Sequence, residues 1–187
     1  MEAWSNFMIT GHVFIATSLD GYIARDDGDI AWLSSIPTEG EDHGYVQFIA
    51  GVDGVIMGRE TFRKALEFDT WPYNKPVMVL SRSLRQEDLP PRLHATVQVS
   101  SDPPDVLMQS LSQKGWKRAY VDGGRVVQSF MKMGLITDLT ITTIPILLGK
   151  GRPLFGSSLC DVLLEHLNTT AFPSGLVQST YRVPSRV

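Results

Sequence analysis

Residues 119–131 read Ala-Tyr-Val-Asp-Gly-Gly-Arg-Val-Val-Gln-Ser-Phe-Met, and this stretch decides the fold. Ala119–Val121 predicts a buried strand, which leads through Asp122-Gly123-Gly124 into a segment with apolar residues four positions apart. These pairs are Val126 with Phe130 and Val127 with Met131. A strand that passes through glycines into a helix is the repeating unit of α/β proteins, so the stretch predicts an α/β fold.

The alternation of strand and helix continues on both sides of this unit. Strands are expected at residues 12–17, 53–57, 77–80, 97–99 and 139–144, and helices at residues 41–50, at residues 60–66 and from residue 103 onward. Residues 163–172 and 176–183, joined by Pro173-Ser174-Gly175, predict a closing β-hairpin. The sequence therefore predicts a mixed, mostly parallel central sheet flanked by helices, with an antiparallel hairpin at its C-terminal edge.

The chain has the size and composition of one domain. Its 187 residues, of which 43% are hydrophobic and 20% charged, are enough to form one core, and they show no linker or second compositional block. We therefore predict a single domain over residues 1–187, in which residues 1–10 form a flexible N-terminal extension.

Charge and cysteine content exclude several classes of function. The formal net charge of −3 gives no basic footprint for nucleic acid. The single cysteine, Cys160, cannot form an internal disulfide and is interpreted as a small buried side chain. We find no signal peptide and no apolar run of the ~18 residues that a bilayer span needs, so a cytosolic protein is expected. No metal site is expected either, because the histidines are scattered, at His12, His43, His94 and His166.

Three predicted strand ends carry glycine, arginine or hydroxyl groups. Gly123-Gly124-Arg125 lies between a strand and a helix, where backbone N–H groups and the helix dipole attract anions. Gly58-Arg59-Glu60-Thr61 occupies a second such junction, and Ser81-Arg82 follows a third strand. Ligands of open α/β sheets collect at this edge, so the three junctions predict a site for a pyrophosphate and a 2′-phosphate. Taken singly, the glycine pair could be an ordinary tight turn and each arginine a solvated surface charge.

Carboxylates and one tryptophan are the other candidates. Asp20, Asp42 and Asp122 could handle a proton, because each falls at a predicted strand end or near the start of a helix at the same edge. Asp20 could equally be a turn residue that bonds its own backbone, and Asp42 a charge at a helix N-terminus. Trp32 could form the floor of a pocket for a flat heterocycle, or belong to the core.

Five motifs occur in order: residues 16–24 (Ala-Thr-Ser-Leu-Asp-Gly-Tyr-Ile-Ala), 55–62 (Val-Ile-Met-Gly-Arg-Glu-Thr-Phe), 79–82 (Val-Leu-Ser-Arg), 121–124 (Val-Asp-Gly-Gly) and 145–151 (Pro-Ile-Leu-Leu-Gly-Lys-Gly). Together they resemble the dihydrofolate reductase superfamily. Within it, the chain is similar to the reductase domain of the riboflavin-biosynthesis deaminase-reductase, the RibD C-terminal domain, and to its stand-alone relatives. The resemblance implies a dihydrofolate-reductase-like α/β fold.

The resemblance also implies NADPH as hydride donor, a small-molecule substrate and a homodimer. It implies a pocket between the Asp20 loop and the helix that holds Asp42, which falls where dihydrofolate reductases keep their substrate carboxylate. The cofactor-binding residues are then expected to be Ala16, Gly58, Arg59, Thr61, Leu80, Ser81, Arg82, Gly123, Gly124, Arg125 and Val126.

Two departures from the riboflavin enzymes bear on the substrate. The glutamate that usually precedes the glycine pair is Asp122 here, and Leu66–Trp71 takes the place of an acidic, proline-containing stretch. The leading hypothesis is an NADPH-dependent reductase of a small polar substrate, for example 5-amino-6-(5-phosphoribosylamino)uracil of riboflavin biosynthesis. The alternatives are an NADPH-binding sensor or interaction module without turnover, and a dihydrofolate reductase.

Overall fold

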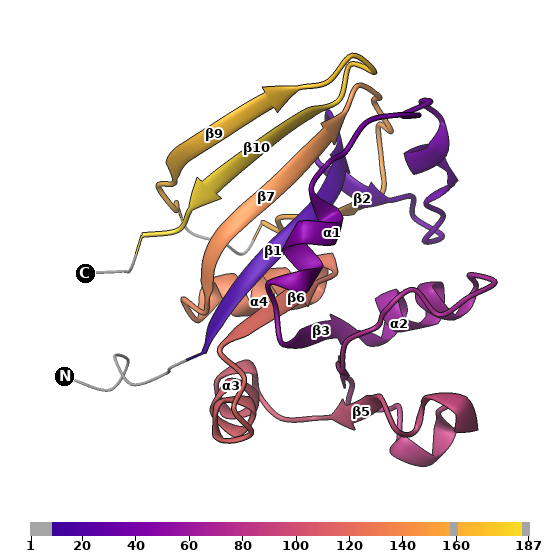
Figure 1. Ribbon diagram of the computed structural model, residues 1–187, viewed down its shortest axis with the longest axis vertical. Helices are drawn as coiled ribbons and strands as arrows, with labels where there is room; N and C mark the ends of the chain where they lie inside the picture. The colour runs from indigo at the N-terminus through magenta and orange to yellow at the C-terminus, as the bar shows by residue number, and fades with distance from the viewer. Residues whose placement is uncertain (1–8, 158–160, 185–187) are drawn as a thin grey trace.

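The computed structural model describes residues 9–157 and 161–184, in which helices pack on both faces of an eight-stranded sheet (Figure 1). The strand order is β5 (Val97–Ser100), β4 (Val77–Leu80), β3 (Gly54–Gly58), β6 (Arg118–Asp122), β1 (Thr10–Ser18), β7 (Ile136–Ile144), β10 (Val177–Arg182) and β9 (Glu165–Ala171). From β5 to β7 in this order, neighbouring strands are parallel. Strand β10 then runs antiparallel to both of its neighbours, β7 and β9. A small second sheet pairs β2 (Tyr22–Ala24) with β8 (Arg152–Pro153). The predicted fold class is confirmed.

Alternate side chains of the central strands point to opposite faces and separate two hydrophobic cores. In β6, Ala119 and Val121 face the core under α3 and α4, whereas Tyr120 faces the core under α1 and α2. A third, smaller cluster lies under the 3₁₀ helix η1. The helices are α1 (Tyr45–Ala50), α2 (Arg59–Leu66), α3 (Pro104–Gln113) and α4 (Gly124–Lys132), with η1 (Ala31–Ser34), η2 (Gln86–Asp88) and η3 (Pro91–Leu93) as short 3₁₀ turns.

Several elements begin at other residues than predicted. The helix expected over residues 41–50 begins at Tyr45, because Gly44 takes a left-handed φ of 78° and the residues before it bond elsewhere. The strand expected over residues 139–144 begins at Ile136, opposite Gly11 of β1. Backbone pairing with β1 thus extends β7 beyond the apolar residues from which the strand was predicted.

The N-terminal part of β1 bears on the predicted extension. Ile9 is 4% exposed and Thr10 is the first residue of β1, so these two residues belong to the folded domain and not to a flexible extension. Residues 1–8 and Cys160, by contrast, lie outside the described residues. Within the part of the chain that the structure describes, no helix is both long and apolar enough to cross a bilayer.

Candidate active site

The carboxyl ends of β6, β3 and β4 lie side by side at one edge of the sheet. In the strand register, Met57 is opposite Asp122 and Gly58 is opposite Leu80. The junctions singled out in the sequence follow these three strands. The structure therefore brings all of them to the same edge.

Two of the junctions are in direct contact. A Cβ on Gly123 would overlap Thr61 Oγ1, and a Cβ on Gly58 would lie 3.2 Å from Val126 Cγ2. Gly123 also has a φ of 89°, which side chains with a Cβ rarely adopt. Backbone conformation and packing thus both require this glycine, and they place the first turns of α2 and α4 against each other.

The adjoining helix N-termini have no capping side chain. Gly58 is the N-cap of α2 and Gly123 the N-cap of α4, and neither helix receives a side-chain cap hydrogen bond. The first N–H groups of a helix need partners and carry partial positive charge. Arg59 and Arg125 are the first and second residues of their helices, so this corner can hold an anion such as a pyrophosphate.

The third junction joins the same corner through Arg59. Its Nη1 donates to Ser83 Oγ, in the loop after β4. Ser81 shapes that loop by accepting hydrogen bonds from the backbone N–H groups of Ser83 at 3.2 Å and Leu84 at 3.0 Å. Arg82 is exposed beside it. The guanidinium groups expected from the sequence therefore gather along the ends of β3, β4 and β6.

Four other predicted residues lie inside the protein. Leu80 and Val126 pack in the core under α3 and α4. Ala16 packs against the third cluster, in which Trp32 is 4% exposed beside Ile144 and Leu176. Trp32 is therefore a core residue, although its buried Nε1 has no hydrogen-bond partner among the described residues.

Asp122 occupies the end of β6 within a group of tyrosines. Its Oδ2 accepts a hydrogen bond of 3.3 Å from Tyr73 OH. Tyr120 is two residues earlier on the same face of β6, and its hydroxyl donates to Phe14 O at 2.9 Å. Tyr45, 38% exposed at the start of α1, has its ring 5.8 Å from that of Phe14. We call Asp122, Tyr45, Tyr73 and Tyr120 the Asp122 cluster.

The surroundings of Asp122 favour its protonated form. Burial raises the pKa of its carboxyl to about 6, although the hydrogen bonds from the Gly123 N–H and the Tyr73 hydroxyl act in the opposite direction. The pKa values of Tyr73 and Tyr120 are raised as well, first by burial and then by the charge of Asp122. Asp122 is thus a carboxyl group that keeps its proton to a higher pH than an ordinary aspartate, up to about 6.

Asp20 is held in a different way. Its carboxylate accepts hydrogen bonds from Ser18 Oγ at 2.6 Å, Leu148 N at 3.1 Å and Gly149 N at 2.7 Å. The Ser18 hydroxyl, together with these two backbone N–H groups, lowers the pKa of Asp20. This geometry fits the turn interpretation, extended to a second loop, because a carboxylate stabilised in its charged form is a poor proton donor.

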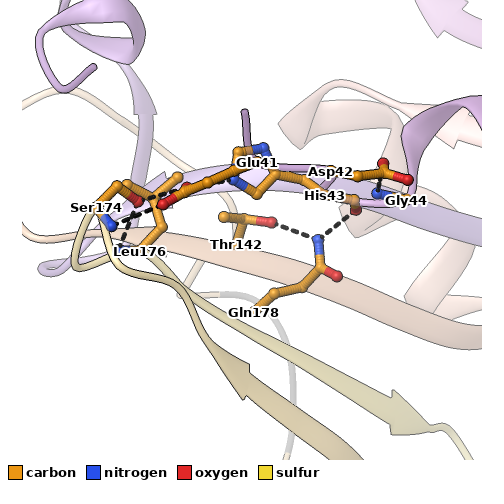
Figure 2. Close-up of polar contacts among 8 residues, drawn as sticks. All are labelled: Glu41, Asp42, His43, Gly44, Thr142, Ser174, Leu176 and Gln178. Carbon is orange, nitrogen blue, oxygen red and sulfur yellow. Dashed lines mark hydrogen bonds and ion pairs between the residues drawn. The ribbon is translucent and has the colours of Figure 1, made fainter. Parts of the chain in front are cut away.

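Asp42 faces away from the network that surrounds it (Figure 2). Its Oδ1 accepts a hydrogen bond of 2.8 Å from Gly44 N, just before α1. The adjacent Glu41 points the opposite way and accepts from the backbone N–H and the hydroxyl of Ser174, both at 2.7 Å. Gln178 Nε2 also stabilises the segment before α1, by donating a hydrogen bond to His43 O at 3.0 Å.

The sequence did not reveal the partners of Asp122. Tyr120 could have been found, since residues two apart on a strand share a face. Tyr73 is far away along the chain, in a turn region with no periodic pattern, so no local signal marks it. Among the described residues, no hydrogen bond joins any two of Asp20, Asp42 and Asp122.

A pocket of about 220 Å³ lies elsewhere, on the side of the sheet covered by α4. None of the predicted site residues lines it. Its walls are formed by Thr17, Gly21, Ile141, Thr143, Leu154, Phe155, Ser179 and Tyr181. No group of three or more His, Cys, Asp or Glu in the described residues is placed to hold a metal ion.

Sequence comparison identifies one family. The model of the RibD C-terminal domain matches residues 10–178. The uncharacterized protein YwjB of Bacillus subtilis (strain 168) is 36% identical over 163 residues, which cover 86% of this chain and 90% of YwjB. A second uncharacterized protein of that bacterium, YyaP, is 24% identical over 180 residues, covering 89% and 91% of the two chains.

Solved structures give the same result. A protein of Shewanella sp. PV-4, named as a candidate riboflavin biosynthesis protein, is 39% identical, with a TM-score of 0.88 over 94% of this chain and 99% of that one. The diaminohydroxyphosphoribosylaminopyrimidine deaminase/5-amino-6-(5-phosphoribosylamino)uracil reductase of Thermotoga maritima has a TM-score of 0.71 at 18% identity. This chain is 94% covered by that match but spans only 57% of the Thermotoga protein, and the likeness shows a shared fold.

Proposed function

Because the chain belongs to the RibD C-terminal domain family, we propose that it is an NADPH-dependent reductase that transfers a hydride to a small polar acceptor. The family supports a reductase of this kind. The cofactor, the acceptor and the residues that bind them are our proposal.

The observation that carries the proposal is the meeting of three phosphate-binding junctions at one sheet edge. Gly123 packs on Thr61, and Arg59 reaches Ser83, so the ends of β6, β3 and β4 form one continuous surface. Two uncapped helix N-termini on it suit a pyrophosphate. Residues that fit the dinucleotide are therefore present.

The arginines favour NADPH over NADH. Arg59, Arg82 and Arg125 offer planar groups that can bind a phosphate through two parallel hydrogen bonds. NADH lacks the 2′-phosphate that such a contact would recognise. We propose that Arg59 and Arg82 bind this phosphate, while the Gly123-Gly124 backbone faces the pyrophosphate.

Asp122 is our candidate for proton transfer. NADPH, when bound, supplies the hydride for reduction of a C=N or C=O carbon of the acceptor. Asp122 would give a proton to the acceptor nitrogen or oxygen, because its carboxyl stays protonated up to a pH of about 6. The hydroxyl of Tyr73 orients that carboxyl. Asp20 would act indirectly, by fixing the loop at residues 148–149, and Asp42 by accepting a hydrogen bond from the Gly44 N–H just before α1.

We further propose that the protein works in the cytosol as a homodimer. The family resemblance supports the dimer. The formal net charge of −3, which gives no basic footprint for a polyanion, supports a small-molecule substrate.

Calorimetric titration with NADPH and with NADH tests the cofactor assignment. The wild-type protein should bind NADPH more tightly. Arg59→Ala and Arg82→Ala should each weaken NADPH binding about tenfold, a loss of ~1.4 kcal/mol, and leave NADH binding nearly unchanged. Arg182→Ala is the matched control, since Arg182 pairs with Glu165 near the opposite end of β7.

Turnover is tested separately with an acceptor panel of pteridines, ribosylated pyrimidines and simple carbonyls. NADPH oxidation with at least one class is the expected result. Tight NADPH binding without oxidation of any acceptor would favour a binding module, and efficient reduction of dihydrofolate would favour a dihydrofolate reductase. Failure to bind either nucleotide would show that the junctions are structural.

A further inference from the structure

The segment that covers the carboxyl ends of β1 and β7 is strongly acidic. Residues 26–44 contain η1, whose Trp32 packs on Ile144 at the end of β7 and near Ala16 of β1. This stretch has no lysine or arginine, and none follows until Arg59. Its carboxylates are Asp26, Asp27, Asp29, Glu39, Glu41 and Asp42. We call residues 26–44 and the Asp122 cluster the acceptor side.

Most cations at the border of this segment pair with its acids or with nearby acids, whereas the Arg152 guanidinium donates to the backbone oxygen of Asp26 at 3.4 Å. Arg25 Nε lies 3.8 Å from Asp29 Oδ2, and Lys150 Nζ lies 3.6 Å from Asp26 Oδ2. Lys64 bonds Glu67 at 2.7 Å, and this bond, reinforced by the charges of Glu67 and of residues 27 and 29, raises the pKa of Lys64. Positive charge at the border therefore balances existing carboxylates.

Asp122 has phenols rather than cations around it. The groups that act on its carboxyl are the Gly123 N–H, Tyr73 and Tyr120, with Tyr45 nearby. A phosphate binds where arginine or lysine can pair with it, and these groups offer none of that charge. The rings of Phe14 and Phe48, 4.9 Å apart, extend the aromatic surroundings beneath Tyr45.

The two sides of the candidate site thus differ in charge. Arg59, Arg82 and Arg125 stand at the ends of β3, β4 and β6, where the cofactor's phosphates are proposed. The acceptor side carries carboxylates and aromatic rings. A phosphorylated acceptor placed there would meet more carboxylates than guanidinium or ammonium groups, and this excess of like charge lowers its affinity.

We propose, on the premise that the protein is the reductase described above, that its acceptor is a planar heterocycle that is neutral or cationic and carries no phosphate. The aromatic rings favour a flat molecule, and the carboxylates favour one that lacks negative charge. The acceptor then differs from a phosphoribosylated pyrimidine of the kind named for the Thermotoga protein.

A matched pair of acceptors tests this inference. One ribosylated aminopyrimidine is supplied with and without its 5′-phosphate, and kcat/KM is measured for both at saturating NADPH. The molecule without phosphate should be used at least about tenfold better, equivalent to ~1.4 kcal/mol. The preference should shrink as salt is added, because exposed carboxylates are screened.

Two variants separate local charge from other effects. Asp42→Asn keeps an oxygen that can accept a hydrogen bond from Gly44 N but removes the negative charge. The preference for the acceptor without phosphate should therefore be severalfold smaller in this variant. Glu87→Gln removes an exposed charge in η2 and should leave the preference unchanged.

The outcomes distinguish this inference from the proposed function. Equal or better use of the phosphorylated molecule overturns the inference and leaves the reductase proposal standing. If the protein binds NADPH but no acceptor leads to oxidation of the bound NADPH, the reductase proposal is overturned, and the inference with it.

Discussion

Asp122 illustrates how the surroundings of one residue change its chemistry. In the sequence it is one of three aspartates at strand or helix ends. In the structure, burial separates it from the others by raising the pKa of its carboxyl to about 6, while hydrogen bonds lower the pKa of Asp20. Residue type and position predicted the candidates. The difference between them depends on the burial of Asp122, which only the folded chain creates.

The proposed role of Asp122 predicts the pH dependence of catalysis. The proton donor is the protonated carboxyl, so kcat should be highest below pH 6 and fall about tenfold per pH unit above it. Asp122→Asn should lower kcat by about 10²- to 10⁴-fold while NADPH binding is retained. Steady-state kinetics over pH 5–9 together with calorimetry of the variant measure both effects.

Stability gives a second readout for Asp122. A carboxyl whose pKa is higher in the folded than in the unfolded chain stabilises the fold at low pH, and this contribution is lost as pH rises from 3.8 to about 6. Asp122→Asn should therefore raise the unfolding free energy at pH 8, by up to about 3 kcal/mol, and have little effect at pH 4. A kcat that does not change in Asp122→Asn would remove this residue from the mechanism.

At the scale of elements, Asp20 joins two loops. Its carboxylate connects the turn after β1 to residues 148–149, beside the segment that leads into β8. Local sequence predicted the turn, because Ser18, Asp20 and Gly21 are typical turn residues. The bond to a loop so far along the chain had no local signal.

Removing this connection should loosen both loops. Asp20→Ala is expected to lower the melting temperature at pH 7 and to speed proteolysis near residues 146–151. Since the pKa of Asp20 is lowered in the fold, its contribution is present above pH 3.8 and lost as pH falls further, so the difference from wild type should narrow in acid. Thermal melts at pH 7 and pH 3 measure it. Asp69→Ala, at another exposed aspartate, is the control, and an equal loss there would contradict the specific role of Asp20.

For the whole molecule, the order of motifs along the chain was enough to predict the sheet and its mixed direction. Strand apolarity and the glycine before α4 are local properties, and the rules for connecting parallel strands leave few arrangements. The beginning of α1 was not predictable, because Glu41 and the residues after it bond to Ser174 and Gln178 near the other end of the chain. Contacts of this range also explain why Trp32 could be interpreted either as a pocket floor or as core.

The far edge of the sheet bears on the proposed homodimer. Among the residues that the structure describes, β9 is the last strand and pairs only with β10, and all seven of its residues are exposed. Leu163 and Leu167 beside and within it are 88% and 43% exposed. An open edge with apolar side chains is a surface on which a second strand can pair. We therefore predict that two copies associate through β9.

Sedimentation should then give twice the 20.8 kDa mass of the chain. Leu167→Lys should shift the protein toward monomers by placing a charge in the contact, at a concentration where wild type is fully dimeric. Val106→Lys, on an exposed position of α3, should leave the dimer intact. A wild-type monomer would contradict the dimer, whereas a dimer that Leu167→Lys does not weaken would place the interface away from β9. NADPH binding by the monomeric variant would show in addition that the junctions of β3, β4 and β6 work within one chain, as their distance from β9 in the strand order requires.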